Sequence, residues 1–496
     1  MISMADVFAG VPQDSGVDLK QCRATFKRWL GDTYDTDALD AMLAAAAVER
    51  LDGDPLWLLI ISGSGNAKTE TVQALSGIDA IVASTIASEA ALLSATQKRD
   101  RAKDATGGLL REIGDRGVLV IKDVTSILSM NRDLRGQVLG ALREVHDGSW
   151  VRKVGAEGGR SLPWSGRIAV IGAVTTKWDT AHDVIAAMGD RFVLVRLDST
   201  KGRIAAGRQA IGNTSFEVQM RAELADAVAG VIAGMDTSGI TVTDEEREVL
   251  LAAANLATLA RTGVEYDNRG DVIDAHAPEM PTRFAKELTQ IVRGSVAIGM
   301  DRHDGLRLAI RCARDSMPPL RLAIIDDLAK HAGSTAQDVR RRLGKPRTTV
   351  DRQMQALHML DVLDVTEEEA EYGGRRVTLW HYFLSKDIDP TALDPNSLPE
   401  KSVPTPRPQE ERGRKDSSSY LVSDKSGKDS ASMDDLHAAT SSPAGESATS
   451  ATEATGPPFY TCRLCPAGLW HHESQQRGIC ASCWKHVGNP NQERTA

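Results

Sequence analysis

Between residue 57 and about residue 198, short apolar runs rich in Val and Ile alternate with segments of helical periodicity. The apolar runs are LWLLII, IDAIVAST, GVLVIKD, GRIAVIGAVT and RFVLVRL. Strands that alternate with helices are typical of a mostly parallel sheet with both faces covered. The pattern therefore predicts an α/β fold with a mostly parallel sheet in this part of the chain.

The segments on either side of these strands have different patterns. Residues 216–315 are expected to be wholly helical, as in ELADAVAGVIAGM, and residues 318–385 to form a compact helical unit that ends in the strand-like run RRVTLWHYFL. From 388 to 457 Ser, Pro, Thr, Asp and Lys dominate and large apolar residues are nearly absent. Such a segment cannot bury enough surface to order itself, so we expect a disordered linker there.

A chain of 496 residues is too long for one ordinary domain. The expected divisions, in chain order, are an N-terminal helical extension (1–50), an α/β core (51–200), a helical lid (201–316), a helical unit with strands (317–387), the linker (388–457) and a small cysteine module (458–490).

The composition and the start of the chain argue against a strongly basic, a secreted or a membrane-spanning protein. A net charge of -9 is mild for this length and argues against a chain coated in basic residues. The start, MISMADVFAGVPQ, lacks the basic and apolar regions of a secretory signal, and the apolar runs are too short to cross a bilayer. We expect a cytoplasmic protein with no membrane partner.

The clearest candidate site follows the first strand. LLIISGSGNAKTETVQALSG runs from an apolar strand through a Gly/Ser loop to a Lys, a Thr and a helical pattern. This is the layout of a phosphate-binding P-loop, in which backbone N–H groups surround phosphates, a Lys reaches them and a hydroxyl holds Mg²⁺. The alternative is a Gly/Ser turn with a solvated Lys. The expected nucleotide-binding residues are Gly63, Ser64, Gly65, Asn66, Ala67, Lys68 and Thr69.

Three further segments follow the loop in the order that a nucleotide-hydrolysing site requires. GVLVIKD ends in Asp123, where a carboxylate would reach the metal, and GRIAVIGAVTT ends in Thr175 and Thr176, placed to sense a γ-phosphate. GDRF then supplies Arg191, a cation suited to phosphoryl transfer across a subunit boundary. Four motifs in this order are much less expected by chance than a single P-loop motif.

In the order of these motifs, the sequence resembles the AAA+ ATPases and, within them, the minichromosome-maintenance (MCM) replicative helicases. The resemblance covers roughly residues 50–300, and the family's P-loop commonly carries Ala before the Lys, as at Ala67. It implies a P-loop ATPase core that uses ATP and Mg²⁺. It also implies that Asp123 ends a Walker B strand, Thr175 is a sensor and Arg191 is the arginine finger.

The same resemblance extends to two further segments. PTRFAKELTQIVRGSVA looks like the sensor-2 helix, with the sensor at Arg283, and LREVHDGSWVRKVGAEGGRSLPWSGRI looks like the helix and pre-sensor hairpin. On that hairpin Arg152 or Lys153 would contact single-stranded DNA, the alternative being an exposed hairpin charge. Sites of this family form between subunits, so a homo-oligomeric ring is implied, with Arg191 acting on a neighbour's ATP.

One position departs from the family's pattern. In register, Lys122 occupies the metal-binding Asp position and Asp123 the catalytic Glu position, and a Lys there would repel Mg²⁺. If Asp123 is instead the metal-linked carboxylate, Val124 replaces the Glu and no obvious base remains. Alternate strand residues face opposite ways, so both interpretations cannot hold. Glu70 is a candidate helper at the metal, or a solvated helix-face side chain.

The helical unit before the linker has a DNA-binding pattern. STAQDVRRRLGKPRTTVDRQMQALHMLDVLDV predicts helix, turn and second helix, and TEEEAEYGGRRVTLWHYFL predicts two strands with a basic tip. Together they resemble a winged helix, whose second helix enters the major groove of duplex DNA while the wing meets phosphate. The alternative is a winged helix used for protein contacts. The expected DNA-binding residues are Arg347, Thr348, Arg352, Gln353 and Arg375.

The last module has a metal-binding spacing. Cys462, Cys465, Cys480 and Cys483 form C-x2-C-x14-C-x2-C, which places four thiolates around a tetrahedral Zn²⁺. We expect a zinc ribbon.

These features support three functional hypotheses. The first is an ATP-dependent DNA-replication protein, a helicase or helicase-like remodeller acting as a ring. The second is a DNA-binding regulator or initiator in which ATP binding switches assembly with little or no turnover, which fits Lys122 better. The third is a scaffold without nucleotide, which the Lys68–Thr69 pair argues against.

Overall fold

The computed structural model describes residues 17–398, apart from 97–101, 156–158, 182–190 and 373–374. All of these described residues belong to one compact unit, Met1–Pro406. The four cysteines of the expected zinc ribbon and most of the expected linker therefore lie outside the described residues.

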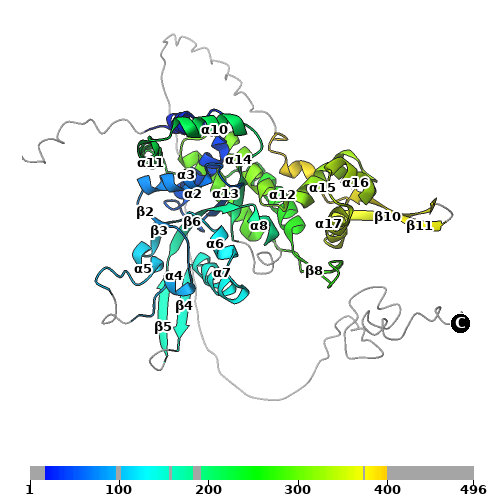
Figure 1. Ribbon diagram of the computed structural model, residues 1–496, viewed down its shortest axis with the longest axis horizontal. Helices are drawn as coiled ribbons and strands as arrows, with labels where there is room; N and C mark the ends of the chain where they lie inside the picture. The colour runs from blue at the N-terminus through cyan, green and yellow to red at the C-terminus, as the bar shows by residue number, and fades with distance from the viewer. Residues whose placement is uncertain (1–16, 97–101, 156–158, 182–190, 373–374, 399–496) are drawn as a thin grey trace, which may run out of the picture. The chain divides into compact units, whose positions relative to one another are not determined.

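A five-stranded sheet lies among the helices of the α/β part of the chain (Figure 1). Its strand order is β2-β3-β6-β1-β7, and all four pairings are parallel. The strands are β1 (Trp57–Ser62), β2 (Ala80–Ala83), β3 (Arg116–Ile121), β6 (Arg167–Thr175) and β7 (Val193–Arg196). They coincide with the five apolar runs, so the predicted α/β fold with a parallel sheet is confirmed.

The sheet separates two apolar cores, because alternate residues of β1 point to opposite faces. Leu58 and Ile60 belong to the first core, and Trp57, Leu59 and Ile61 to the second. The first core is built with α2 (Thr36–Val48), α11 (Glu217–Ala233), α12 (Asp244–Arg261), α13 (Thr282–Ala297) and α14 (Arg302–Asp315). The second includes residues of α4 (Glu89–Leu92), α5 (Leu109–Ile113), α6 (Thr125–Leu128), α7 (Arg132–His146) and α8 (Lys177–Thr180).

Shorter elements connect or extend these layers. Helix α1 (Leu19–Leu30) begins at an Asp18 capping box, which satisfies its first backbone N–H groups. The others in this part of the chain are α3 (Lys68–Gln73), the 3₁₀ turn η2 (Ala74–Gly77), the hairpin β4 (Ser149–Val154) and β5 (Arg160–Ser165), and α10 (Arg203–Gly212).

The expectation that residues 216–315 are wholly helical is wrong at one place. An antiparallel hairpin, β8 (Val264–Tyr266) and β9 (Val272–Ala275), interrupts the helices. Its turn is the sequence DNRG, in which the Asp267 side chain accepts hydrogen bonds from the N–H groups of Arg269 and Asp271. Asp, Asn and Gly between two β-rich runs are the usual hairpin signal, so the sequence carried this information.

The unit that follows contains three helices and a two-stranded antiparallel sheet. The elements are α15 (Pro319–Lys330), α16 (Ala336–Leu343), α17 (Arg347–Met359), β10 (Leu363–Tyr372) and β11 (Arg375–Leu384). A last 3₁₀ turn, η5 (Pro390–Leu393), lies within the segment expected to be linker, yet Leu393 is buried in the first core. Ordered structure thus extends beyond 388, held by single apolar side chains too sparse to form a recognisable pattern.

Helices α2 and α13 approach unusually closely. Gly294 of α13 faces the backbone of Ala44, and a Cβ atom at Gly294 would lie 2.3 Å from the Ala44 carbonyl oxygen. Helix α2 is buried along almost its whole length, with Asp40 paired to Arg23 at 2.8 Å. Only glycine, which lacks a Cβ atom, allows this contact, and the contact fixes α13 against α2.

Gly294→Ala is expected to destabilise the protein by about 2 kcal/mol, because one methyl group must push two buried helices apart. The thermal unfolding midpoint measures this. Gly140→Ala in α7 is the matched control, because a Cβ there meets nothing within 4 Å. That variant should gain about 0.5–1 kcal/mol from higher helix propensity. Equal midpoints for the two variants would contradict the close α2–α13 contact.

Candidate functional site

The segment predicted to be a P-loop, residues 63–69, forms a tight turn between β1 and α3. Strand β1 is buried throughout and ends at Ser62. The turn then uses two left-handed residues, Gly65 with φ 76° and Ala67 with φ 53°. A left-handed backbone conformation is unfavourable for alanine but not for glycine. Contacts around Ala67 must therefore hold its backbone in this conformation. No side chain caps α3, which leaves its first-turn N–H groups directed at the loop.

Lys68 is folded back over this turn. Its Nζ donates a hydrogen bond to the Gly63 carbonyl oxygen at 3.0 Å. Burial lowers the pKa of Lys68, while attraction by the Asp123 carboxylate acts in the opposite direction. The structure thus brings Asp123, from the end of a different strand, within electrostatic range of the P-loop lysine.

The sheet order explains how these two residues meet. Strand β6 lies between β1 and β3, and parallel strands end at the same edge. Thr175, the last residue of β6, is in register with Ser62. Its backbone N–H donates to Thr125 Oγ1 at 3.1 Å, and the two hydroxyls are 3.3 Å apart. Thr175 therefore stands between the P-loop and the segment that carries Asp123.

The acidic segment has one exposed carboxylate. Asp123 is exposed, its backbone N–H donates to the Ser84 carbonyl, and its carboxylate accepts from the Thr125 N–H at 3.0 Å. Val124, the next residue, is only 3% exposed and packs in the second core. The Glu70 carboxylate accepts two hydrogen bonds of 2.9 and 3.0 Å from Arg221 of α11.

A cavity of about 620 Å³ opens beside the loop. Residues 65–70 form one wall, and the segment between α1 and α2 together with α10 and α11 forms the others. Trp29 and Tyr34 are its aromatic side chains, and Tyr34 Oη lies 2.9 Å from Thr71 Oγ1 of α3. Its volume is in the usual range for small-molecule sites. The sequence did not predict these N-terminal lining residues, because their only local signal is two aromatic residues in a polar stretch.

Arg191 lies at the other end of the sheet. It precedes β7, whose Val193 is in register with Leu58 near the start of β1. The P-loop follows the end of β1, and a strand of that length spans about 20 Å. Arg191 therefore cannot reach the P-loop of its own chain. It contacts Asp147 through two nitrogens, each at 3.4 Å.

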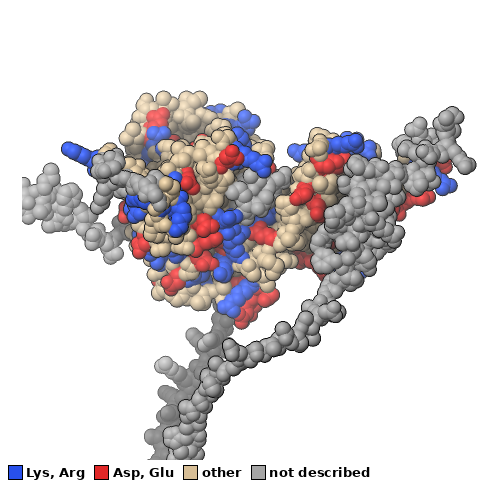
Figure 2. All heavy atoms as spheres, turned by 90° about the horizontal axis from the view of Figure 1, so that it is seen from below, with Lys and Arg blue, Asp and Glu red and all other residues tan. Residues whose placement is uncertain are grey.

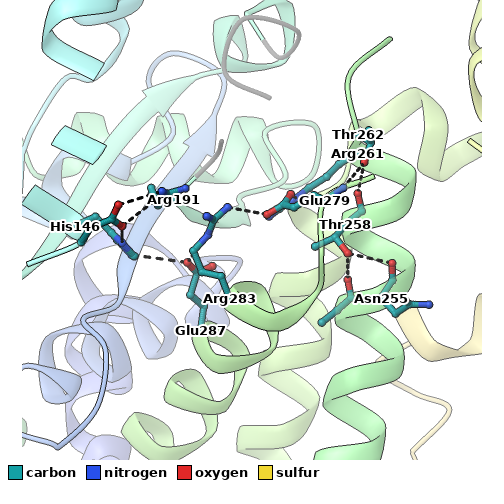
Figure 3. Close-up of polar contacts among 11 residues, drawn as sticks. His146, Arg191, Asn255, Thr258, Arg261, Thr262, Glu279, Arg283 and Glu287 are labelled. Atoms are coloured by element: carbon teal, nitrogen blue, oxygen red, sulfur yellow. Dashed lines mark hydrogen bonds and ion pairs between the residues drawn. The ribbon is translucent and has the colours of Figure 1, made fainter. Parts of the chain in front are cut away.

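Arg283 lies in the same region, in a polar network between core and lid (Figure 3). Its Nη2 is 2.8 Å from Glu279 and its Nε 3.7 Å from Glu287. The network comprises His146, Asp147, Arg191, Arg261, Glu279, Arg283 and Glu287. Neither Arg191 nor Arg283 lines the cavity beside the P-loop.

His146 occupies the buried end of this network. Its side chain is 6% exposed and lies 3.8 Å from Glu287, with Asp147 on its other nitrogen at 3.3 Å. Burial lowers the pKa of His146 to about 4, the nearby guanidinium groups adding to the effect and Asp147 opposing it. His146 is therefore neutral at pH 7.

The two basic residues of the β4–β5 hairpin have different environments. Arg152 is 13% exposed and is held by Glu89 at 2.8 Å and by the Leu93 carbonyl at 2.8 Å. Lys153 is exposed and contacts Ser161 of the facing strand at 2.7 Å. Of the two residues predicted to contact DNA, Lys153 is the accessible one.

Helix α17 presents only part of its predicted DNA face. Arg347 and Thr348 are exposed at its N-terminal end. Gln353 instead accepts from Arg321 Nε at 2.9 Å and donates to Tyr266 Oη of β8 at 3.2 Å. Arg352 contacts the Arg269 carbonyl and Asp271 in the β8–β9 turn. The lid hairpin thus covers the middle of α17.

Charged side chains of both signs are interspersed on the face shown in Figure 2, without a continuous basic surface. Arg375 begins β11, but its side chain lies outside the described residues. Across the part of the chain that the structure describes, no three His, Cys, Asp or Glu side chains are grouped as a metal site. The same residues include no helix long and apolar enough to cross a membrane.

Comparison with known proteins does not assign the chain to a family. No protein-family model and no curated protein matches the chain. Among solved structures, two matches are apo structures of the C-terminal region of NrS-1. They have 13% and 9% identity, TM-scores of 0.25 and 0.24, and cover 76% and 73% of this chain and 80% and 74% of theirs.

The pH dependence of stability tests the environment of His146. The pKa of His146 is about 6.5 in the unfolded chain and about 4 in the folded protein. The neutral histidine's contribution to stability is therefore complete above pH 6.5 and is lost as the pH falls towards 4. At pH 5 the loss amounts to about 2 kcal/mol. His146→Gln should show a smaller fall in melting temperature between pH 7 and 5, whereas His276→Gln, at a half-buried position, should follow the wild type. A wild-type pH profile in His146→Gln would contradict a buried neutral histidine.

A second variant separates a structural role of Gln353 from a DNA-binding one. Arg321 is 1% exposed and donates to Gln353 and to the Ala260 and Thr262 carbonyls. Gln353→Ala removes one acceptor of a buried cation, so we expect a loss of about 1–3 kcal/mol in unfolding free energy. The exposed Arg347→Ala should leave the melting temperature unchanged. If Gln353→Ala melts like the wild type, its contact with Arg321 contributes no stability.

Proposed function

We propose that the protein binds ATP with Mg²⁺ at the P-loop and acts on DNA as an AAA+ ATPase, as a helicase-like replication protein. One observation carries the proposal: the loop with Lys68 and the strand end with Asp123, from separate segments, lie at the same carboxyl edge of the sheet within electrostatic range of one another, and Lys68 lines a cavity of about 620 Å³. Ligands of open α/β sheets bind outside this edge. The resemblance of the motif order to the MCM helicases supports the same assignment.

The residues present fit the nucleotide. The partner of Lys68 is a backbone carbonyl, which a phosphate oxygen can replace, and space above Gly65 is open because a Cβ there meets nothing within 4 Å. Trp29 and Tyr34 offer aromatic surface to a base. Thr69 and Asp123 would supply oxygen donors for Mg²⁺, which would neutralise charge on the phosphates.

Each residue of this chain then has a defined task. Lys68 and the loop N–H groups hold the phosphates, and the Thr175 hydroxyl orients groups between the P-loop and Asp123. Arg191 and Arg283 lie about one strand length away, so in this proposal they serve the site of a neighbouring copy. A homo-oligomeric ring follows from that requirement.

DNA contact is assigned to two parts of the chain. Single-stranded DNA would meet Lys153 on the β4–β5 hairpin, and duplex DNA would meet Arg347 and Thr348 at the start of α17, within a winged helix formed by α15 to β11. The four C-terminal cysteines would bind Zn²⁺ as a zinc ribbon. A cytoplasmic location is part of the same proposal.

A second candidate is a regulator or initiator that uses ATP binding as an assembly switch. Val124 is buried where a catalytic carboxylate would be needed, and Arg221 holds Glu70. In the described residues no carboxylate follows Asp123 in α6 to act as a base towards water. This observation favours binding without turnover, with the covered α17 as the switched element.

ATP binding and turnover by the purified protein, with and without single-stranded DNA, distinguish the two candidates. Lys68→Ala should weaken ATP binding by about 10- to 100-fold, because a charge-assisted contact to phosphate is lost. Asp123→Asn should retain most of the binding and reduce turnover by about 100-fold. Lys122→Ala is the matched control, since it alters the adjacent side chain.

Turnover that DNA raises and Asp123→Asn abolishes supports the helicase-like ATPase. ATP binding without turnover supports the switch. If Lys122→Ala impairs turnover as much as Asp123→Asn, the assignment of Asp123 to the metal is contradicted. Wild-type ATP binding in Lys68→Ala would overturn the nucleotide site itself.

A further inference from the structure

The β10–β11 hairpin has features that neither ATP nor DNA binding uses. Its two strands, each of ten residues, pair only with one another over most of their length, and the described sheet contains no third strand. Near its outer half three apolar side chains are exposed: Val377 at 37%, Leu379 at 37% and Trp380 at 40%. Such a hairpin leaves two strand edges and both faces uncovered.

Strand β10 carries a row of carboxylates. Glu367, Glu369 and Glu371 are exposed and stand opposite Trp380, Thr378 and Arg376 in the register. Since side chains alternate along a strand, these three glutamates share one face with Trp380. Ala370 is opposite Val377 and Glu368 opposite Leu379 on the other face. One face is thus aromatic and carries three carboxylates against the single cation Arg376, and the other carries Ala370, Val377 and Leu379 beside the ion pair of Glu368 with His381.

The backbone of the same residues is directed outward. At the base of the hairpin, the Tyr382 N–H donates to the Ser334 carbonyl and its carbonyl accepts from the Gly333 N–H, so its peptide groups point away from β10. In an antiparallel pair the opposite residue, Val365, points away at the other edge, and so does every second residue after it. Glu367, Glu369 and Glu371 therefore present their N–H and C=O groups at the β10 edge, where no described residue accepts or donates.

We propose that the outer edge of β10 binds an extended, basic segment of a partner protein as a third strand. Lys or Arg at alternate positions of that segment would lie across from Glu367, Glu369 and Glu371, and apolar residues between them would cover Ala370 beside Val377. A second copy of this hairpin does not fit the edge, because glutamate would oppose glutamate. The same carboxylates repel the phosphates of DNA.

Charged residues on an edge strand also have a simpler role, since they prevent aggregation. Protection alone does not account for the exposed Trp380, Val377 and Leu379, which raise the tendency of an edge to associate. An aromatic ring beside a row of carboxylates instead provides both a cation–π contact and charge pairing for an incoming Lys or Arg. This site is independent of the nucleotide site, so failure of one proposal leaves the other intact.

The probe is a fluorescently labelled ten-residue peptide of alternating Lys and Val, titrated with the full-length protein and followed by anisotropy. We expect saturable binding that weakens with salt, and no binding of the matching Glu–Val peptide. Glu369→Lys should raise the Kd about tenfold, because attraction at the centre of the edge becomes repulsion. Glu248→Lys, on an exposed position of α12, carries the same charge change and should bind like the wild type.

Two further arms decide the mode of binding. A Lys–Val peptide N-methylated at alternate residues cannot form the ladder and should bind at least about tenfold more weakly. Equal affinity of the methylated peptide, or an equal loss in Glu248→Lys and Glu369→Lys, would overturn strand addition. Absence of peptide binding together with tighter binding of a duplex DNA by Glu369→Lys would assign the hairpin to DNA and overturn the proposal.

Discussion

All five strands of the central sheet run in one direction, and this constraint separates the charged groups into two sets. The P-loop, Thr175 and Asp123 follow the carboxyl ends of β1, β6 and β3, so they meet at one edge. Arg191 precedes β7 and lies at the opposite edge with Asp147. No rearrangement of side chains alone can bring these sets together within one chain, because the strands between them are rigid and buried.

A polar network with a buried centre at His146 and Glu287 joins α7 to α12 and α13. The network from Asp147 and His146 through Glu287, Arg283 and Glu279 to Arg261 crosses between α7, α13 and α12. His146 and Glu287 are both buried, so removing one of them leaves the other without this partner away from water and destabilises the folded protein. The network therefore favours one relative position of α13 and the sheet, the position that the close approach of Gly294 to Ala44 also requires.

The C-terminal helical unit is tied to the lid in the same manner. Arg321 is buried among backbone carbonyls of the lid and reaches Gln353 of α17, while the β8–β9 turn contacts Arg352. A helix whose middle is covered in this way can meet duplex DNA only by its N-terminal end, or after the hairpin moves. The acidic outer edge of β10 makes the β10–β11 hairpin unlike a phosphate-binding surface.

The sequence by itself determined the elements whose information is local. Five apolar runs with period-2 or continuous burial became the five strands, and SGSGNAKT became the turn that holds Lys68, since short-range sterics and burial decide both. The tertiary structure alone decided which partner each long polar side chain found. Arg152 turned to Glu89, Glu70 to Arg221, and Gln353 to Arg321, although local patterns left all of them exposed. Those pairings depend on distances between segments up to 151 residues apart, which no local pattern of side chains encodes.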